Sequence, residues 1–214
     1  MSRPRVLLAD DHILVLEGLR KIIEEDYEIA GMVEDGRALI EAAQRLDPDV
    51  IVLDISMPLL NGLEAARQIK NMMPHSKLIF LTMHADPSYA TEAFQAGASG
   101  FLLKRSAVTE LGEAIRAVLN NHFYVTQLIA KDLLSPLAQI SSRNPPKGVQ
   151  LTTRQREVLQ LVAEGMAIKK IATVLNISVK TVEFHKTHIM EKLDLHTTAE
   201  LTRYAISHKL VSFE

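Results

Sequence analysis

Three aspartates in the first part of the chain follow short apolar segments and are the residues best placed to do chemistry. Asp10 and Asp11 come directly after Val6–Ala9. Asp54 comes directly after Val50–Leu53. If these segments are neighbouring parallel strands, the three carboxylates converge where ligands bind in an open α/β sheet, and their mutual repulsion requires a cation. Ligands that are all oxygen favour Mg²⁺, which keeps several waters and readily bridges to a phosphoryl oxygen.

The surrounding sequence alternates short apolar runs with amphipathic stretches from Arg5 to about Leu119. The apolar runs are too short and too uniform for surface helices and predict five strands, namely Val6–Ala9, Ile29–Val33, Val50–Leu53, Leu78–Thr82 and Phe101–Leu103. Apolar residues at helical spacing predict the helices between and after them, near His12–Glu25, Arg37–Arg45, Leu63–Met73, Ser88–Gln95 and Val108–Leu119. This alternation is typical of a doubly wound α/β domain whose five-stranded parallel sheet is covered on both faces, and we expect the flavodoxin-like strand order.

The pattern changes after residue 121. Gln127–Leu137 could form a helix, and Ser141–Gly148 has the Ser, Pro and Gly content of a linker. Capping-box patterns and N-cap residues then predict four helices. The first is begun by Thr152 with Gln155 and is followed by Gly165. The other three extend over about Ile168–Leu175, Val179–Leu193 and Thr198–His208. We therefore predict a first domain over 1–122, a partly helical linker over 123–148 and a small all-α domain of four helices over 149–214.

The first domain resembles the receiver domain of two-component response regulators over about residues 4–122. The matching segments are Ala9-Asp10-Asp11-His12, Leu53-Asp54-Ile55-Ser56-Met57-Pro58 followed by Asn61-Gly62, Leu81-Thr82, and Gly100-Phe101-Leu102-Leu103-Lys104. Arg105 follows Lys104, where receivers often have proline. The resemblance implies that Asp54 accepts a phosphoryl group from a sensor histidine kinase.

The same resemblance implies a role for each residue around Asp54. Asp10, Asp11, Asp54 and the backbone carbonyl of Ser56 would hold Mg²⁺. Thr82 would bond a phosphoryl oxygen, Lys104 would supply positive charge to it, and Phe101 would be the aromatic that changes rotamer. Taken singly, an aspartate at a strand end is usually a turn former, and Thr82 and Phe101 fit ordinary strand and core positions. The prediction therefore depends on the whole set at these spacings.

Such a domain would catalyse only its own phosphorylation and dephosphorylation, because phosphoryl transfer needs mainly positioning and neutralisation of charge. It would not be an enzyme acting on an external substrate. The chain contains no G-x-S-x-G, P-loop or H-E-x-x-H pattern, which argues against a hydrolase or transferase.

Residues 150–211 resemble the LuxR-type helix-turn-helix module of the NarL/FixJ class of response regulators. The match consists of Leu151-Thr152-Thr153-Arg154-Gln155-Arg156-Glu157-Val158-Leu159, Ile171-Ala172, Ile177-Ser178-Val179-Lys180-Thr181-Val182-Glu183-Phe184-His185 and Lys192-Leu193. The resemblance implies a transcription regulator that binds double-stranded promoter DNA. The sequence departs from the family pattern at two positions outside the helix face expected to meet DNA. Ala167 replaces a frequent Ser or Thr cap, and Asp194 replaces a common glycine.

Helical spacing predicts which face of Val179–Leu193 meets DNA. Val182, Ile189 and Leu193 fall on one side and should pack against the domain. The N-terminal half of a recognition helix leads into the major groove, so the candidate contacts are Lys180, Thr181, Phe184, Thr187 and His188, with Lys186 reaching toward phosphate. Phe184 could instead pack on the linker or the receiver. His185 and His188 lack a third ligand nearby, which favours packing or backbone contacts over a metal site.

One such module covers a short half-site, so we expect a homodimer when the protein is active. By resemblance, the last helix would form that contact through Leu201, Tyr204 and Ala205. RNA polymerase is a further candidate partner. We expect phosphorylation of Asp54 to release the second domain by a population shift. Two alternatives stay open: the same regulator acting without phosphorylation under a partner protein, and a receiver that acts only by protein contact.

Composition sets further bounds. The net charge of −2 combines an acidic first part with a region over 150–214 that holds nine Lys or Arg and seven Asp or Glu. That excess is too small to argue for DNA binding by itself. The absence of cysteine excludes disulfides and thiolate zinc sites. Asp10 and Asp11 interrupt the first apolar run, and no run reaches the roughly 18 residues of a membrane span, so we expect a cytoplasmic protein without a membrane partner.

Overall fold

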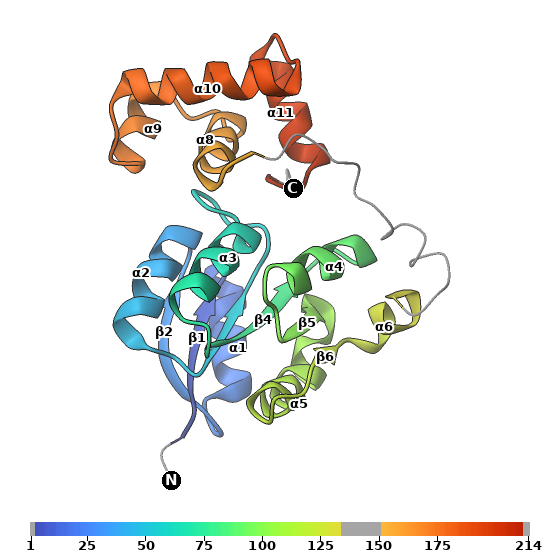
Figure 1. Ribbon diagram of the computed structural model, residues 1–214. Helices are drawn as coiled ribbons and strands as arrows, with labels where there is room; N and C mark the ends of the chain where they lie inside the picture. The colour runs from blue at the N-terminus through green and yellow to red at the C-terminus, as the bar shows by residue number, and fades with distance from the viewer. Residues whose placement is uncertain (1–2, 134–150, 212–214) are drawn as a thin grey trace. The chain divides into compact units, whose positions relative to one another are not determined.

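The computed structural model describes residues 3–133 and 151–211 (Figure 1). The chain divides into two compact units, of which the first carries the elements from β1 to α6 and the second those from α8 to α11. Each unit has its own hydrophobic core and is described by itself. The predicted linker Ser141–Gly148 and the end of the predicted helix Gln127–Leu137 lie outside the described residues.

The first unit is built on a parallel sheet in the order β2-β1-β3-β4-β5-β6. Its strands are β1 (Arg5–Ala9), β2 (Glu28–Val33), β3 (Val50–Leu53), β4 (Lys77–Thr82), β5 (Gly100–Leu103) and β6 (Tyr124–Val125). The order confirms the flavodoxin-like topology and the neighbouring positions of β1 and β3. The sixth strand was not predicted, because two residues are too few to show a pattern. Tyr124 and Val125 pair with Gly100 and Phe101 of β5, so the sheet extends past residue 122.

Helices cover both faces of this sheet. They are α1 (Ile13–Ile23), α2 (Gly36–Leu46), α3 (Gly62–Met72), α4 (Pro87–Gln95), α5 (Ala107–Leu119) and α6 (Gln127–Leu133), with a 3₁₀ turn η1 at Lys104–Ser106. One core cluster joins α1 and α5 to alternate strand residues, for example Leu8, Val52 and Leu81. The intervening strand residues, such as Leu7, Ile51 and Phe80, are also fully buried, as expected for strands covered on both faces.

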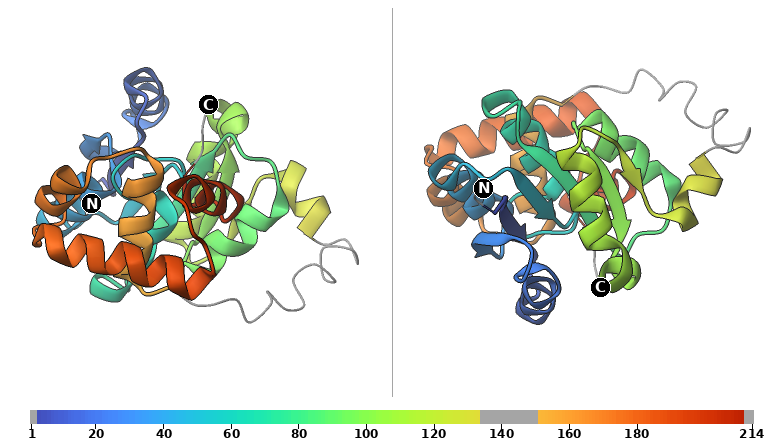
Figure 2. Two further views of the ribbon diagram at one scale, coloured as in Figure 1. Left: turned by 90° about the horizontal axis from the view of Figure 1, so that it is seen from above. Right: turned by 90° about the horizontal axis from the view of Figure 1, so that it is seen from below.

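Within residues 151–211 the second unit contains four helices, as predicted. They are α8 (Thr153–Ala163), α9 (Ile168–Val174), α10 (Val179–Leu193) and α11 (Thr198–Ser207), and α10 packs against α8 and α9 (Figure 2). The capping boxes at Thr152 and Thr197 are formed, and the Ser178 side chain accepts a hydrogen bond from the Thr181 amide. None of the helices in the described ranges combines the length and the hydropathy of a bilayer-spanning segment.

Two helix ends in the second unit lack their best residues, as the sequence indicated. Ala167 is the N-cap of α9, has extended backbone angles and makes no side-chain cap hydrogen bond. Asp194 ends α10 in the left-handed conformation at φ 54°, where glycine carries no steric cost. Both residues are exposed, so these ends can be changed without disturbing the core.

We predict that Ala167→Ser stabilises α9 by about 1 kcal/mol, because a serine hydroxyl at an N-cap accepts a hydrogen bond from an unpaired amide of the first turn. Amide hydrogen exchange in α9, followed by mass spectrometry on the full chain, should slow by about fivefold. Ser178→Ala is the matched control and should accelerate exchange at the start of α10 by a similar factor. Unchanged α9 exchange in Ala167→Ser would contradict the prediction.

Candidate functional site

The register of the sheet brings the predicted carboxylates together. Ala9 of β1 pairs with Leu53 of β3, and the Asp54 amide donates a hydrogen bond of 2.9 Å to the Ala9 carbonyl oxygen. Asp10 and Asp54 therefore leave adjacent strands at the same level. Both are buried, with 1% and 4% of their surfaces exposed. Two carboxylates in such a place need positive charge nearby.

Lys104 supplies that charge. It follows Leu103, which pairs with Thr82 of β4, so the end of β5 reaches the same edge of the sheet. Lys104 Nζ lies 2.7 Å from Asp10 Oδ2 and 2.7 Å from Asp54 Oδ2. The ammonium group thus bridges the two carboxylates, which were predicted to share a site but not to share one lysine.

Burial and charge act in opposite directions on this cluster. Burial, together with the nearby Asp10, raises the pKa of Asp54 by more than Lys104 and the amide of Ile55 lower it. For Lys104, burial lowers the pKa, but Asp54 and Asp10 together outweigh it, so the pKa lies above its usual range. Lys104 consequently stays protonated between the two carboxylates at neutral pH.

Asp11 is exposed beside this pair and contacts His12. His12 Nδ1 lies 2.9 Å from Asp11 Oδ1 and 3.3 Å from Asp10 Oδ1. Asp11 raises the pKa of His12 by more than burial lowers it. The ligand atoms of Asp10, Asp11 and His12 lie within 4.8 Å of one another. Two carboxylates with Asp54 close by form an oxygen-rich donor set, whose chemistry fits a hard divalent cation such as Mg²⁺.

His84 is a residue near the site that the sequence analysis missed. Its amide donates to Thr82 Oγ1 at 3.2 Å, and its Nε2 lies 3.0 Å from Ser56 Oγ. Its ring also stacks on Tyr89 of α4 at a centroid distance of 4.4 Å. His84 therefore connects the loops after β3 and β4 to α4. No sequence pattern signals a hydrogen bond between loops this far apart in the chain.

Gly62 and Phe101 also shape the region around Asp54. A Cβ atom at Gly62 would overlap the Asp54 carbonyl oxygen, so α3 can begin this close to Asp54 only with glycine. The sequence analysis noted Gly62 in a motif but assigned it no role. Phe101 is fully buried and pairs in register with Phe80 of β4. A change of its rotamer would therefore require neighbouring core residues to move, and that role stays a prediction.

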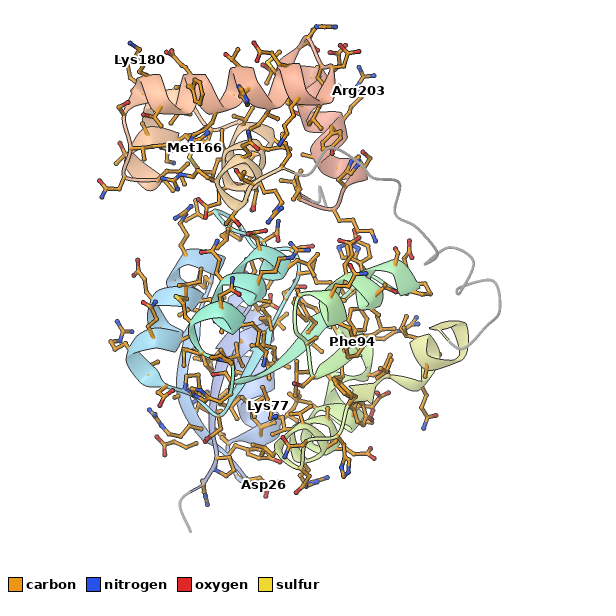
Figure 3. The ribbon with its side chains drawn as sticks, in the orientation of Figure 1. Asp26, Lys77, Phe94, Met166, Lys180 and Arg203 are labelled. Carbon is orange, nitrogen blue, oxygen red and sulfur yellow. The ribbon has the colours of Figure 1, made fainter. Side chains whose placement is uncertain are left out.

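One face of α10 is buried and the opposite face is exposed, as predicted. Val182 and Ile189 are buried and Leu193 packs against the same core. The opposite side carries exposed residues, which are Lys180, Phe184, Thr187 and His188. Phe184 is 61% exposed, so the core of the second unit does not enclose its ring. Figure 3 shows the Lys180 side chain at the start of α10 pointing away from α8 and α9.

The other two candidate contacts on α10 already have partners within the unit. The Thr181 hydroxyl lies 2.8 Å from Ser178 Oγ in the N-cap. Lys186 Nζ donates to Thr198 Oγ1 at 2.9 Å. Either side chain would have to exchange this partner to contact DNA.

The two histidines of α10 contact other residues of the second unit. Burial, helped by the nearby Arg154, lowers the pKa of His185. His188 Nδ1 lies 3.7 Å from Glu191 Oε2. In the described part of the chain, no group of three potential ligands includes either histidine.

The predicted dimer residues need a correction. Leu201 and Ala205 are 1% and 0% exposed and belong to the core that α11 forms with α8. They therefore have no exposed surface that a second subunit could contact. The prediction was wrong because helical spacing alone did not show which side of α11 faces inward. Tyr204 is half-buried and stacks on His208. The exposed residues of this helix include Arg203 and Ile206.

Comparisons with known proteins agree with both units. The model of the response regulator receiver domain matches residues 6–116, and the model of the luxR family of bacterial regulatory proteins matches residues 149–205. The oxygen regulatory protein NreC of Staphylococcus haemolyticus is 36% identical over 218 residues, 98% of this chain and 100% of that protein. NreC of Staphylococcus epidermidis is 38% identical over 221 residues, with the same coverage of 98% and 100%.

Solved structures of the Salmonella response regulator RcsB align with nearly the whole chain. One from Salmonella typhimurium has a TM-score of 0.63 and 32% identity, covering 97% of this chain and 98% of that chain. RcsB of Salmonella enterica bound to a promoter in the presence of the phosphomimetic BeF₃⁻ has a TM-score of 0.60 and 32% identity, covering 97% and 100%. A structure of two RcsB dimers on two parallel DNAs has a TM-score of 0.59 and 31% identity, covering 96% and 99%.

The α/β topology of the first unit and the four helices described in the second agree with these matches. The chain belongs to the two-component response regulators of the NarL/FixJ class, with a receiver domain followed by a LuxR-type DNA-binding domain.

Proposed function

We propose that a sensor histidine kinase phosphorylates Asp54 in the presence of Mg²⁺, and that this controls binding of the regulator to promoter DNA as a homodimer. The observation that carries the proposal is the bridge from Lys104 to Asp10 and Asp54 at the buried ends of β1 and β3. The bridge supports the proposal because it joins Lys104 to two buried carboxylates, one of which could accept a phosphoryl group while the other helps to hold a cation. Phosphoryl transfer needs such a set.

Each residue then has a defined task. An oxygen of Asp54 forms the new bond to phosphorus while the imidazole of the kinase phosphohistidine leaves. Mg²⁺, held by Asp10, Asp11, Asp54 and the Ser56 carbonyl, would neutralise charge on the phosphoryl oxygens. Lys104 exchanges its contact with Asp54 for one with the phosphoryl group. The Thr82 hydroxyl, which accepts a hydrogen bond from the His84 amide, would donate a hydrogen bond to a phosphoryl oxygen.

The chain would act on itself alone. Water attack on the acyl phosphate of Asp54 releases inorganic phosphate and returns the resting carboxylate, so Asp54 of the chain itself would be the group that is phosphorylated and dephosphorylated. The structure of RcsB on a promoter with BeF₃⁻ and that of RcsB dimers on DNA support the extension to dimeric DNA binding. Arg203 and Ile206, on the exposed side of α11, replace Leu201 and Ala205 as candidate dimer contacts. RNA polymerase stays a candidate partner on the promoter.

We expect BeF₃⁻ with Mg²⁺ to shift the wild-type chain toward a dimer and to tighten promoter binding by about 5- to 150-fold, the usual range of a coupling free energy. Asp54→Asn should show neither change, because its amide cannot hold the acyl-phosphate mimic. Sedimentation velocity and DNA-binding titrations on the same samples measure both effects.

Asp26→Asn is the matched control, since Asp26 is exposed at the far end of the first unit from the carboxylate site (Figure 3). It should respond like the wild type. Equal mass and affinity with and without BeF₃⁻ in the wild type would contradict control through Asp54. That result would favour the same DNA-binding regulator under control by a partner protein.

Lys104→Met should destabilise the Mg²⁺-free protein by about 3 kcal/mol, because two buried carboxylates lose their shared counter-charge. Mg²⁺ should recover part of that loss, so its effect on the melting temperature should be larger in the variant than in the wild type. Thermal unfolding with and without Mg²⁺ measures this difference. Arg105→Met, at the exposed neighbouring position, should respond to Mg²⁺ like the wild type. Equal Mg²⁺ effects in all three proteins would argue against a cation between Asp10 and Asp54.

If Lys180 contacts a phosphate, Lys180→Ala should weaken DNA binding. It should also reduce the magnitude of the negative slope of log Kobs against log salt by about one per bound subunit. If Lys180 reads a guanine edge instead, the slope should change little and discrimination at one base pair should fall. Lys192→Ala, at the other end of α10, should alter neither quantity. A Lys180→Ala protein with wild-type affinity, slope and discrimination would remove Lys180 from the interface.

A further inference from the structure

Phe184 is exposed at a position where the fold does not need it. It is 61% accessible to solvent, while Val182 and Ile189 on the opposite side of α10 fill the core. Single exposed apolar residues are ordinary in soluble proteins. The neighbours of Phe184 therefore decide whether its exposure has a function.

Two histidine rings contact the Phe184 ring. His188, one helical turn later, stacks on it with a centroid distance of 5.4 Å and an interplanar angle of 24°. His185 meets it edge-on at 5.8 Å and 63°. These contacts restrict the rotation of Phe184 before any ligand arrives, so little conformational entropy is lost on binding. Phe184 and His188 together form a preorganised aromatic pair.

The surroundings of this pair suit the edge of a base rather than a phosphate. Lys180 and Thr187 flank it on the exposed face, and Glu191 lies 3.7 Å from His188 Nδ1. A carboxylate this close disfavours a phosphate at the pair but not an uncharged base edge. In the major groove, the apolar group that base edges present is the C5-methyl of thymine.

We propose that the aromatic pair of Phe184 and His188 reads the 5-methyl group of a pyrimidine in the major groove. The inference rests on the proposed DNA-binding function of α10 and assigns one base contact within it. Burying one methyl group against an apolar side chain strengthens binding by about fourfold. The pair thus selects thymine over cytosine, and 5-methylcytosine, which carries the same methyl group, substitutes for thymine at that position.

Removing single methyl groups from the DNA tests the proposal. The full chain with Mg²⁺ and BeF₃⁻ selects a binding site from a random duplex library, and each thymine of the recovered duplex is replaced in turn by uracil. We expect at least one uracil substitution per half-site to weaken wild-type binding by about fourfold. The same substitution should leave the affinity of Phe184→Ala unchanged, because the partner of the methyl group is already absent.

Further variants separate the ring from its surroundings. Phe184→Leu should retain part of the methyl effect, and His188→Ala should reduce it, since the ring loses its stacking partner. Lys192→Ala, at the other end of α10, should keep the full effect. A cytosine at the sensitive position should bind weakly, and 5-methylcytosine there should recover about the fourfold difference.

The outcomes are distinguishable. Uracil substitutions that weaken the wild type and Phe184→Ala equally, or that weaken neither, would overturn the proposal while leaving DNA binding intact. Failure to recover any bound duplex would overturn the proposed DNA-binding function and this inference with it. Circular dichroism melting of Phe184→Ala should match the wild type, because the ring is exposed and contributes nothing to the core.

Discussion

The first unit depends on the neutralisation of two buried carboxylates by one lysine. Asp10 and Asp54 are almost completely buried, and an unpaired buried charge is far more costly than the pairing itself is stabilising. Lys104 lies 2.7 Å from both and therefore ties the ends of β1, β3 and β5 together. Under the proposed function, the same arrangement keeps Asp54 near a charge that can contact the phosphoryl group. One cluster would then serve both local stability and phosphoryl transfer.

The parallel sheet determines where that cluster can form. Parallel strands bring their carboxyl ends to one edge, and the β1–β3 register places Asp10 level with Asp54. Gly62 allows α3 to begin against the backbone of Asp54, because any side chain there would overlap the carbonyl oxygen. His84 links the loops after β3 and β4 to Tyr89 on α4. The loop that follows Asp54 is therefore joined to α4 through His84.

The two faces of α10 in the second unit have different surroundings. One face fills the core with Val182 and Ile189 and fixes the helix against α8 and α9. The other presents Lys180, the aromatic pair of Phe184 and His188, and Thr187 to solvent. The less favourable helix ends at Ala167 and Asp194 lie away from this face. The two helix ends and this exposed face are therefore separate features of the unit.

Much of both units followed from the sequence, because local patterns carry the information for local elements. Apolar runs and helical spacing predicted five strands and the helices near their observed bounds, and the capping pairs Thr152–Gln155 and Thr197–Glu200 formed as expected. The carboxylates were also predictable, since a residue that directly follows a parallel strand must lie at the carboxyl edge of the sheet. The family resemblance supplied their roles, which distances alone do not establish.

Tertiary structure decided what depends on contacts between distant segments. The bridge by Lys104, the bond from His84 to Ser56 and the pairing of β6 with β5 join segments whose separation leaves no periodic signal. The inward side of α11 was also undetermined, because Leu201, Tyr204 and Ala205 share one helical stripe and only packing against α8 shows that the stripe faces the core. Sequence thus specified the elements and the residue types at their ends, whereas packing specified which of those residues meet.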